Sequence, residues 1–204
     1  MRQIRIHRFL IALLPLTLAA CISSSPSARF YTLHADISGV DPGSQALGDD
    51  WVGVGPIDVP DYLDRPQIVT RGDGHRLIIH EFDRWADPVK NRILDVVIGN
   101  VVALSDSKRV APYPWPSTFR PSRRMMGEIT AFEARPAGDV LLRVRWLISI
   151  PGDRENEEIH VGEYVEPAAP GDFDAMAEAM SRALERWSRD IASALSESVA
   201  NDRE

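Results

Sequence analysis

The sequence contains one cysteine, Cys21, among its 204 residues. A disulfide within the chain is therefore excluded, and Cys21 must be inert packing, a reactive thiol or an attachment point. The chain also lacks a long apolar run. Its most apolar stretch, residues 9–20, is interrupted by Pro15 and is shorter than the about 20 apolar residues that a membrane-spanning helix needs. A permanent transmembrane helix is not expected.

Positive charge is scarce, because 23 Lys and Arg stand against 30 Asp and Glu, for a net charge of −7. Three of the arginines, Arg2, Arg5 and Arg8, lie at the very start of the chain, so the rest is more acidic still. An acidic protein gains no electrostatic attraction from phosphate groups. Nucleic acid and an anionic lipid surface are therefore not expected as electrostatic partners.

Sequence signatures of catalysis are also missing. The stretch "GVGPID" has Asp58 where a dinucleotide-binding fingerprint needs its third glycine, and no "GxSxG" motif marks a nucleophilic serine. The stretch "HEFDRW", which starts at His80, lacks the paired histidines of a helical zinc site. We therefore expect neither an enzyme nor a cofactor or metal site, although a triad assembled in space stays open.

The first 21 residues carry a recognisable pattern. Three arginines precede the apolar stretch, and small residues follow it, as in a secretion signal. The sequence "LAAC" then resembles the bacterial lipobox, in which the cysteine receives a diacylglyceryl group and becomes the first residue of the mature protein. The pattern predicts a signal peptide at residues 1–20, lipidation at Cys21 and a Ser/Pro tether at residues 21–29.

Lipidation implies a membrane address. Two or more acyl chains hold a protein stably at a bilayer. Ile22 stands where an aspartate would retain a lipoprotein at the inner membrane, so the expected location is the periplasmic face of the outer membrane. The tether after Cys21, "ISSSPSAR", reaches about 27 Å at full extension. A partner that crosses the periplasm must therefore come to the anchored domain.

Periodicity in the rest of the chain favours one α+β domain at residues 30–200, in which one mostly antiparallel or mixed sheet packs with two main helices. The acidic segment 152–158 is predicted as a loop, and residues 72–75 as a hairpin turn. Strands are predicted at residues 30–35, 51–59, 67–71, 76–82, 108–115, 123–135, 140–150 and 158–166.

The first predicted helix has Asp87 as N-cap and Pro88 as its first helical residue, and the second spans residues 172–199. Each carries one apolar stripe. The stripes are Val89, Ile93, Val97, Val101 and Leu104 in the first helix, and Phe173, Met176, Met180, Leu184, Trp187, Ile191 and Leu195 in the second.

The segment "PYPWPSTFRPSRR", residues 112–124, alternates prolines with Tyr113, Trp115 and Phe119. Prolines stiffen the backbone, and aromatic residues dominate binding hot spots, so these three are candidate partner-binding residues. The alternative is that they plug the space under a loop. Arg123 and Arg124 are expected either to be solvated or to pair with the excess acids.

Several stretches together resemble the ABC-type transport auxiliary lipoproteins, the PqiC-like family. They are "FYTL", "VGVGPIDVPDYLDRPQIVTR", "FDRWADPV", "VAPYPW", "AFE" and "ALERWSRDIASAL", in this order along nearly the whole mature chain. The resemblance implies a lipoprotein that works with mammalian-cell-entry (MCE) domain proteins and inner-membrane transporter subunits to move lipids or other hydrophobic molecules between membranes. It brings no catalytic residues to this chain.

Three hypotheses follow. The first is a non-enzymatic lipoprotein that docks the periplasm-spanning MCE partner at the outer membrane. The second is a periplasmic carrier that holds an acyl chain between its sheet and helices, and the third is an envelope hydrolase. Self-association into a homo-oligomer also stays open.

Overall fold

The computed structural model describes residues 26–35, 43 and 45–201. The predicted signal peptide and the predicted lipidation site Cys21 lie outside these residues. Along the chain the elements are β1 (Arg29–Tyr31), β2 (Val52–Asp58), β3 (Gln67–Arg71), β4 (Leu77–Trp85), α2 (Val89–Ser105), β5 (Val110–Pro112), β6 (Arg123–Arg135), β7 (Asp139–Ile150), β8 (Asp153–Pro167) and α3 (Phe173–Asn201).

The strands form two sheets. The larger has the order β5-β2-β6-β7-β8, and the smaller has the order β1-β4-β3. Strands β6, β7 and β8 are antiparallel neighbours, whereas β2 runs parallel to both β5 and β6, and β1 runs parallel to β4. The α+β prediction is confirmed, but two sheets stand where one was expected. Parallel pairs join strands that are distant in the chain, and no local turn signals them.

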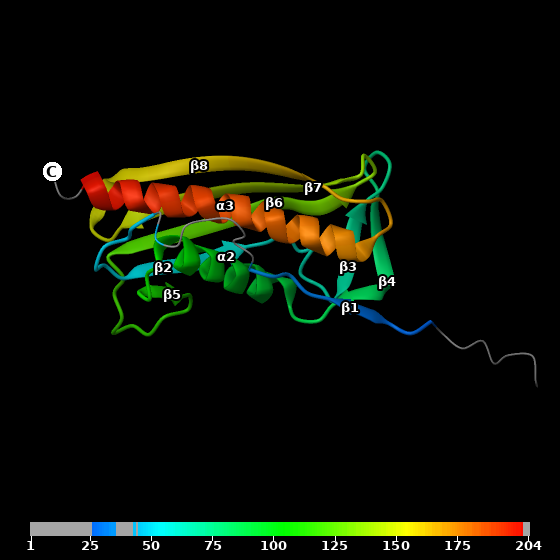
Figure 1. The fold of residues 1–204 in the computed structure, drawn as a ribbon, viewed down its shortest axis with the longest axis horizontal. Helices are drawn as coiled ribbons and strands as arrows, with labels where there is room; N and C mark the ends of the chain where they lie inside the picture. The colour runs from blue at the N-terminus through cyan, green and yellow to red at the C-terminus, as the bar shows by residue number, and fades with distance from the viewer. Residues whose placement is uncertain (1–25, 36–42, 44, 202–204) are drawn as a thin grey trace, which may run out of the picture.

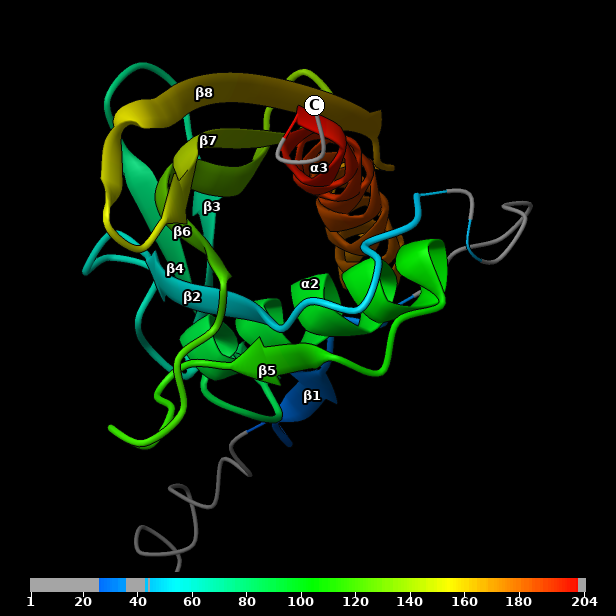
Figure 2. The ribbon, with the colours of Figure 1, turned by 90° about the vertical axis from the view of Figure 1, so that its left-hand side faces the viewer.

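Both helices help to close the core. Helix α3 packs against β7, β8 and α2, and α2 also packs against β2. The long strands and the helices run along the longest axis of the molecule (Figure 1), and β8 curves over α3 when viewed from one end (Figure 2). The predicted stripe of α2 is buried, as is that of α3 apart from the half-buried Phe173. Trp187 in α3 is completely buried.

The start of α2 differs from the prediction. The helix begins at Val89, and Pro88 takes the N-cap position with ψ 116° and no side-chain cap. The Pro88 carbonyl already accepts the N–H of Arg92 at 3.1 Å, which is the first helical hydrogen bond. Asp87 is therefore one residue too early to cap this helix.

The acidic segment 152–158, predicted as a loop, is mostly part of a strand. Strand β7 extends to Ile150, and β8 begins at Asp153 after a tight turn. Gly152 in that turn has φ +98°, a conformation open mainly to glycine. The predicted hairpin around residues 72–75 is confirmed, because β3 and β4 pair antiparallel across it.

Candidate functional site

The proline-aromatic segment after β5 is attached at one end to β2 and at the other to the residue just before β2. The N–H of Tyr113 donates to the carbonyl of Val54 at 2.9 Å. The N–H and the hydroxyl of Ser122 both donate to the carbonyl of Trp51, at 2.9 and 3.0 Å. These bonds hold the segment on the strand, although its prolines supply no backbone donors.

Trp115 lies half-buried against the backbone of β2. A β-carbon on Gly53 would lie 2.8 Å from Cη2 of Trp115 and 2.9 Å from Cγ of Pro121, so the ring occupies the space of the missing side chain. The Tyr113 ring meets the Trp115 ring edge-on, with centroids 5.2 Å apart, and the guanidinium of Arg124 lies 5.9 Å from the Trp115 ring. Both arrangements are favourable for aromatic rings.

Phe119 pairs with a different aromatic residue, Trp51, at 5.2 Å and an interplanar angle of 87°. Trp51 is 44% exposed and Tyr113 is 45% exposed, whereas Trp115 and Phe119 are half-buried. The two half-buried rings thus support the two exposed ones. We call these four residues, Trp51, Tyr113, Trp115 and Phe119, the aromatic surface.

Composition alone does not mark Trp51 as a candidate, because it stands at the start of a predicted strand, outside the proline-aromatic segment. Alternation gives the signal that could have found it: Val52 faces the core, so the side chain of Trp51 points to the opposite face of the strand. Arg123, near the end of the segment, is buried and donates to Asp50 at 2.5 Å and to the hydroxyl of Ser198 at 3.0 Å. Of the two expectations for this arginine, pairing with an acid is the one observed.

Two of the stretches that carry the family resemblance meet at Glu133 of "AFE". The hydroxyl of Tyr62 donates to Glu133 at 2.5 Å, and Nε of Arg71 donates to it at 2.8 Å. Glu133 is buried at 3% exposure. Burial and the bond to Glu133 raise the pKa of Tyr62 above its ordinary value. These residues tie β3 and the preceding loop to β6, which is a structural role.

A second pair of these stretches meets at Asp83 of "FDRW". Arg29 donates to its two oxygens at 2.7 and 2.9 Å, and the hydroxyl of Tyr31 donates at 3.0 Å. The bond from Arg29 is the main reason that the pKa of Asp83 lies below its usual range. Asp83 thereby fastens β1, the first strand, to β4.

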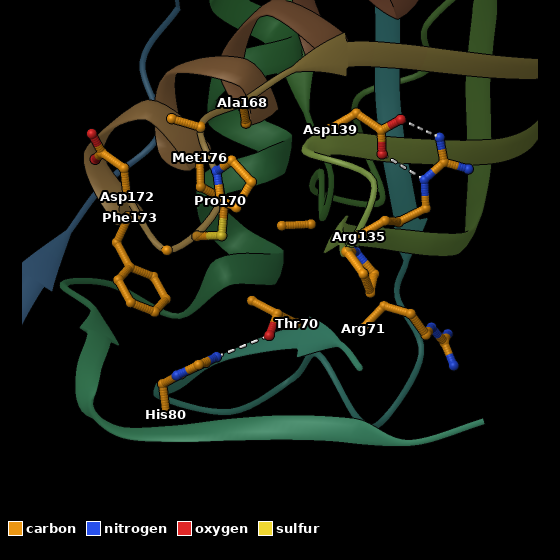
Figure 3. A pocket seen from close by; sticks show the side chains of 14 residues that line it. Thr70, Arg71, His80, Arg135, Asp139, Ala168, Pro170, Asp172, Phe173 and Met176 are labelled. Atoms are coloured by element: carbon orange, nitrogen blue, oxygen red, sulfur yellow. Dashed lines mark hydrogen bonds and ion pairs between the residues drawn. The ribbon is translucent and has the colours of Figure 1, made fainter. Parts of the chain in front are cut away.

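A cavity of about 200 Å³ lies between the small sheet, the β6–β7 turn and the start of α3 (Figure 3). His80 Nε2 and the Thr70 hydroxyl form a hydrogen bond of 2.9 Å on one side, and Arg135 binds Asp139 through two 2.7 Å bonds on another. The bond from Arg135 lowers the pKa of Asp139, and burial lowers that of His80. These four polar side chains of the cavity thus bind one another in two pairs.

In the part of the chain that the structure describes, no three His, Cys, Asp or Glu side chains are grouped to hold a metal ion. Neither of the helices described is both long enough and apolar enough to cross a bilayer.

Comparison with known proteins identifies the family. The ABC-type transport auxiliary lipoprotein component family matches residues 31–192, a span that includes every strand from β2 to β8 and all of the aromatic surface. The chain belongs to this family. It is therefore an auxiliary lipoprotein component of a transport system. The family resemblance inferred from the sequence is confirmed.

Two named relatives match this chain in sequence, and a solved structure matches it in fold. The chain is 24% identical over 145 residues to the intermembrane transport lipoprotein PqiC of Escherichia coli K12. The aligned residues make up 71% of this chain and 75% of that protein. PqiC of Shigella flexneri matches to the same extent. A crystal structure of a Xanthomonas campestris protein has the same fold, with a TM-score of 0.73 and 16% identity over 86% of this chain and 99% of that one.

Proposed function

We propose that this protein is a non-enzymatic lipoprotein of the outer membrane that docks the MCE-domain protein of an intermembrane transport system. Cys21 carries the lipid anchor on the periplasmic face, and the aromatic surface contacts the partner. The similarity to PqiC, an intermembrane transport lipoprotein, supports the transport role. The "LAAC" sequence supports the anchor.

The observation that carries the docking proposal is the position and build of the aromatic surface. The green loop that contains Tyr113 and Trp115 lies at one end of the molecule, and β1, where the chain arrives from the tether, lies at the other (Figure 1). A partner that reaches across the periplasm meets the end away from the anchor. There it finds Trp51 and Tyr113 exposed on a stiff, bonded backbone, which lowers the entropy cost of binding.

The carrier hypothesis has less support. An acyl chain held between the sheets and the helices needs an apolar cavity there. The void that Val69, Trp85, Phe132 and Met180 help to line at this place measures about 10 Å³. That is no more than the about 10 to 15 Å³ that one water molecule needs on the same measure, so an acyl chain does not fit there.

The docking proposal is tested with Trp51→Ala and Tyr113→Ala in the full-length chain. We expect each to weaken binding to the purified MCE-domain partner by about 2 kcal/mol, or roughly 30-fold in Kd, as for hot-spot aromatics. Thr118→Ala, an exposed change in the same loop, is the control and should bind like the parent. Unchanged affinity in both aromatic variants, with unchanged unfolding temperature, would move the docking site elsewhere.

A further inference from the structure

We propose that the outer face of the small sheet rests on the lipid leaflet that holds the anchor, so that the domain is oriented as well as tethered. This inference rests on the proposed lipidation of Cys21. The contact surface is an apolar patch formed by Phe30 and Phe82. These side chains are 64% and 42% exposed.

The patch lies on two adjacent strands. Arg29 and Tyr31 both bind Asp83, so alternation along β1 turns Phe30 to the opposite face of the sheet. Phe82 is the chain neighbour of the buried Asp83 and is itself exposed, so it lies on the same outer face as Phe30. The register agrees, because Phe30 pairs with Arg84, two residues beyond Phe82.

The position of the patch identifies what covers it. Phe30 is only nine positions after Cys21 in the sequence, and the intervening tether reaches about 27 Å at most. Strands β1, β3 and β4 lie together at the end of the molecule where the chain enters (Figure 1). The acyl anchor therefore keeps this patch near the bilayer surface. At such proximity even a weak apolar contact is well populated, because the second binding event is intramolecular.

Charge around the patch favours contact through apolar groups alone. Arg29 is paired with Asp83 at 2.7 Å, and Arg84 lies 4.0 Å from Glu81. These basic groups are thus close to carboxylates and leave little net positive charge for anionic headgroups. Exposed phenylalanine side chains enter the boundary between headgroups and acyl chains, as in interfacial anchors. The contact should therefore be the same on zwitterionic and anionic lipid and should persist in high salt.

The test uses the mature lipidated protein in phosphatidylcholine vesicles that contain a spin-labelled lipid quencher. A fluorescent label is attached at Glu81→Cys, which keeps the patch intact, and in a control protein at Ala200→Cys, an exposed position near the end of α3. We expect strong quenching at position 81 and several-fold weaker quenching at position 200. Adding Phe30→Ser and Phe82→Ser to the Glu81→Cys protein should reduce the quenching to the level of the control.

Mass spectrometry of the N-terminal peptide separates the two proposals. If Cys21 carries lipid but the label at position 81 is quenched no more than that at position 200, the patch does not face the membrane and only this inference fails. If Cys21 carries no lipid, the anchor fails and this inference falls with it. If the patch joins two copies of the chain, sedimentation in detergent will show a dimer that Phe30→Ser with Phe82→Ser dissociates, which also overturns membrane contact.

Discussion

The indole ring of Trp115 occupies the space that a side chain on Gly53 would fill, since a β-carbon there would lie 2.8 Å from Cη2 of the ring. Gly53 is in β2, whereas Trp115 follows β5, so a backbone position distant in the sequence shapes the aromatic surface. The Tyr113 ring packs edge-on against the Trp115 ring, so the position of Tyr113 depends indirectly on Gly53.

Gly53→Ala should therefore displace Trp115 and disturb the surface. We expect a loss of about 1 to 3 kcal/mol in the free energy of unfolding, as for overpacked sites, and weaker partner binding. Chemical denaturation and a binding assay measure the two effects. In a Trp115→Ala background the same substitution should cost less, because the crowded ring is gone. Equal costs in both backgrounds would show that the ring does not rest on Gly53.

Glu133→Ala should destabilise the fold by about 3 to 5 kcal/mol, because it leaves Arg71 and Tyr62 without their buried acceptor. Glu128→Ala on the same strand is the matched control. Its half-exposed ion pair with Arg145 should contribute about 0 to 1 kcal/mol. Urea denaturation of both variants measures the difference, and similar midpoints would contradict the structural role of Glu133.

Trp187→Ala should cost about 3 to 5 kcal/mol of stability, because its completely buried ring fills the centre of the core. The exposed Trp51→Ala serves as comparison and should change the unfolding temperature little. Thermal unfolding followed by circular dichroism gives both values. An unchanged temperature for Trp187→Ala would mean that the stripe of α3 faces a partner or another copy.

His80 should make stability depend on pH. Burial lowers its pKa in the folded state, and this effect outweighs the opposite influence of Asp83. As pH falls below about 6.5, the unfolded chain takes up a proton at this residue before the folded chain does, so stability falls. We expect the parent to lose more stability between about pH 7 and pH 5 than His80→Gln does. Parallel slopes in denaturation experiments would show that the folded-state pKa of His80 is ordinary.

Cys21→Ala should abolish lipidation and release the protein from the outer membrane, because the remaining chain has no predicted spanning helix. Cell fractionation, with mass spectrometry of the N-terminus, measures the effect. The conservative Ser23→Ala in the tether is the control and should stay membrane-bound. A Cys21→Ala protein that fractionates with the outer membrane like the parent would disprove attachment through this residue.

The local elements of the fold were predictable from the sequence, because a stripe such as Ile93, Val97 and Val101 repeats at helical spacing and a turn such as that after Arg71 contains glycine. The division into two sheets was not. It depends on parallel pairing of Arg29–Tyr31 with β4, and the decisive contacts, from Arg29 and Tyr31 to Asp83, join residues more than 50 positions apart. The strand character of residues 153–157 was hidden by their charge.

The candidate site was predictable in part. Tyr113, Trp115 and Phe119 were marked by their composition, and their role in partner binding stays a prediction. The structure adds that Trp115 and Phe119 support their neighbours, and that Trp51 completes the surface. Composition cannot predict which rings support and which are exposed. That difference arises because Trp115 packs on Gly53 and Phe119 packs on Trp51.

Strand β1 has a mechanical consequence. If the partner pulls on the aromatic surface while the acyl chains stay in the bilayer, the tension enters the domain through Arg29–Tyr31. The two bonds from Arg29 to Asp83 and the hydrogen bonds between β1 and β4 then take the load together. The hydrophobic core lies beyond this junction, so the junction yields before the core does, and its rupture lengthens the tether without releasing the domain from its anchor.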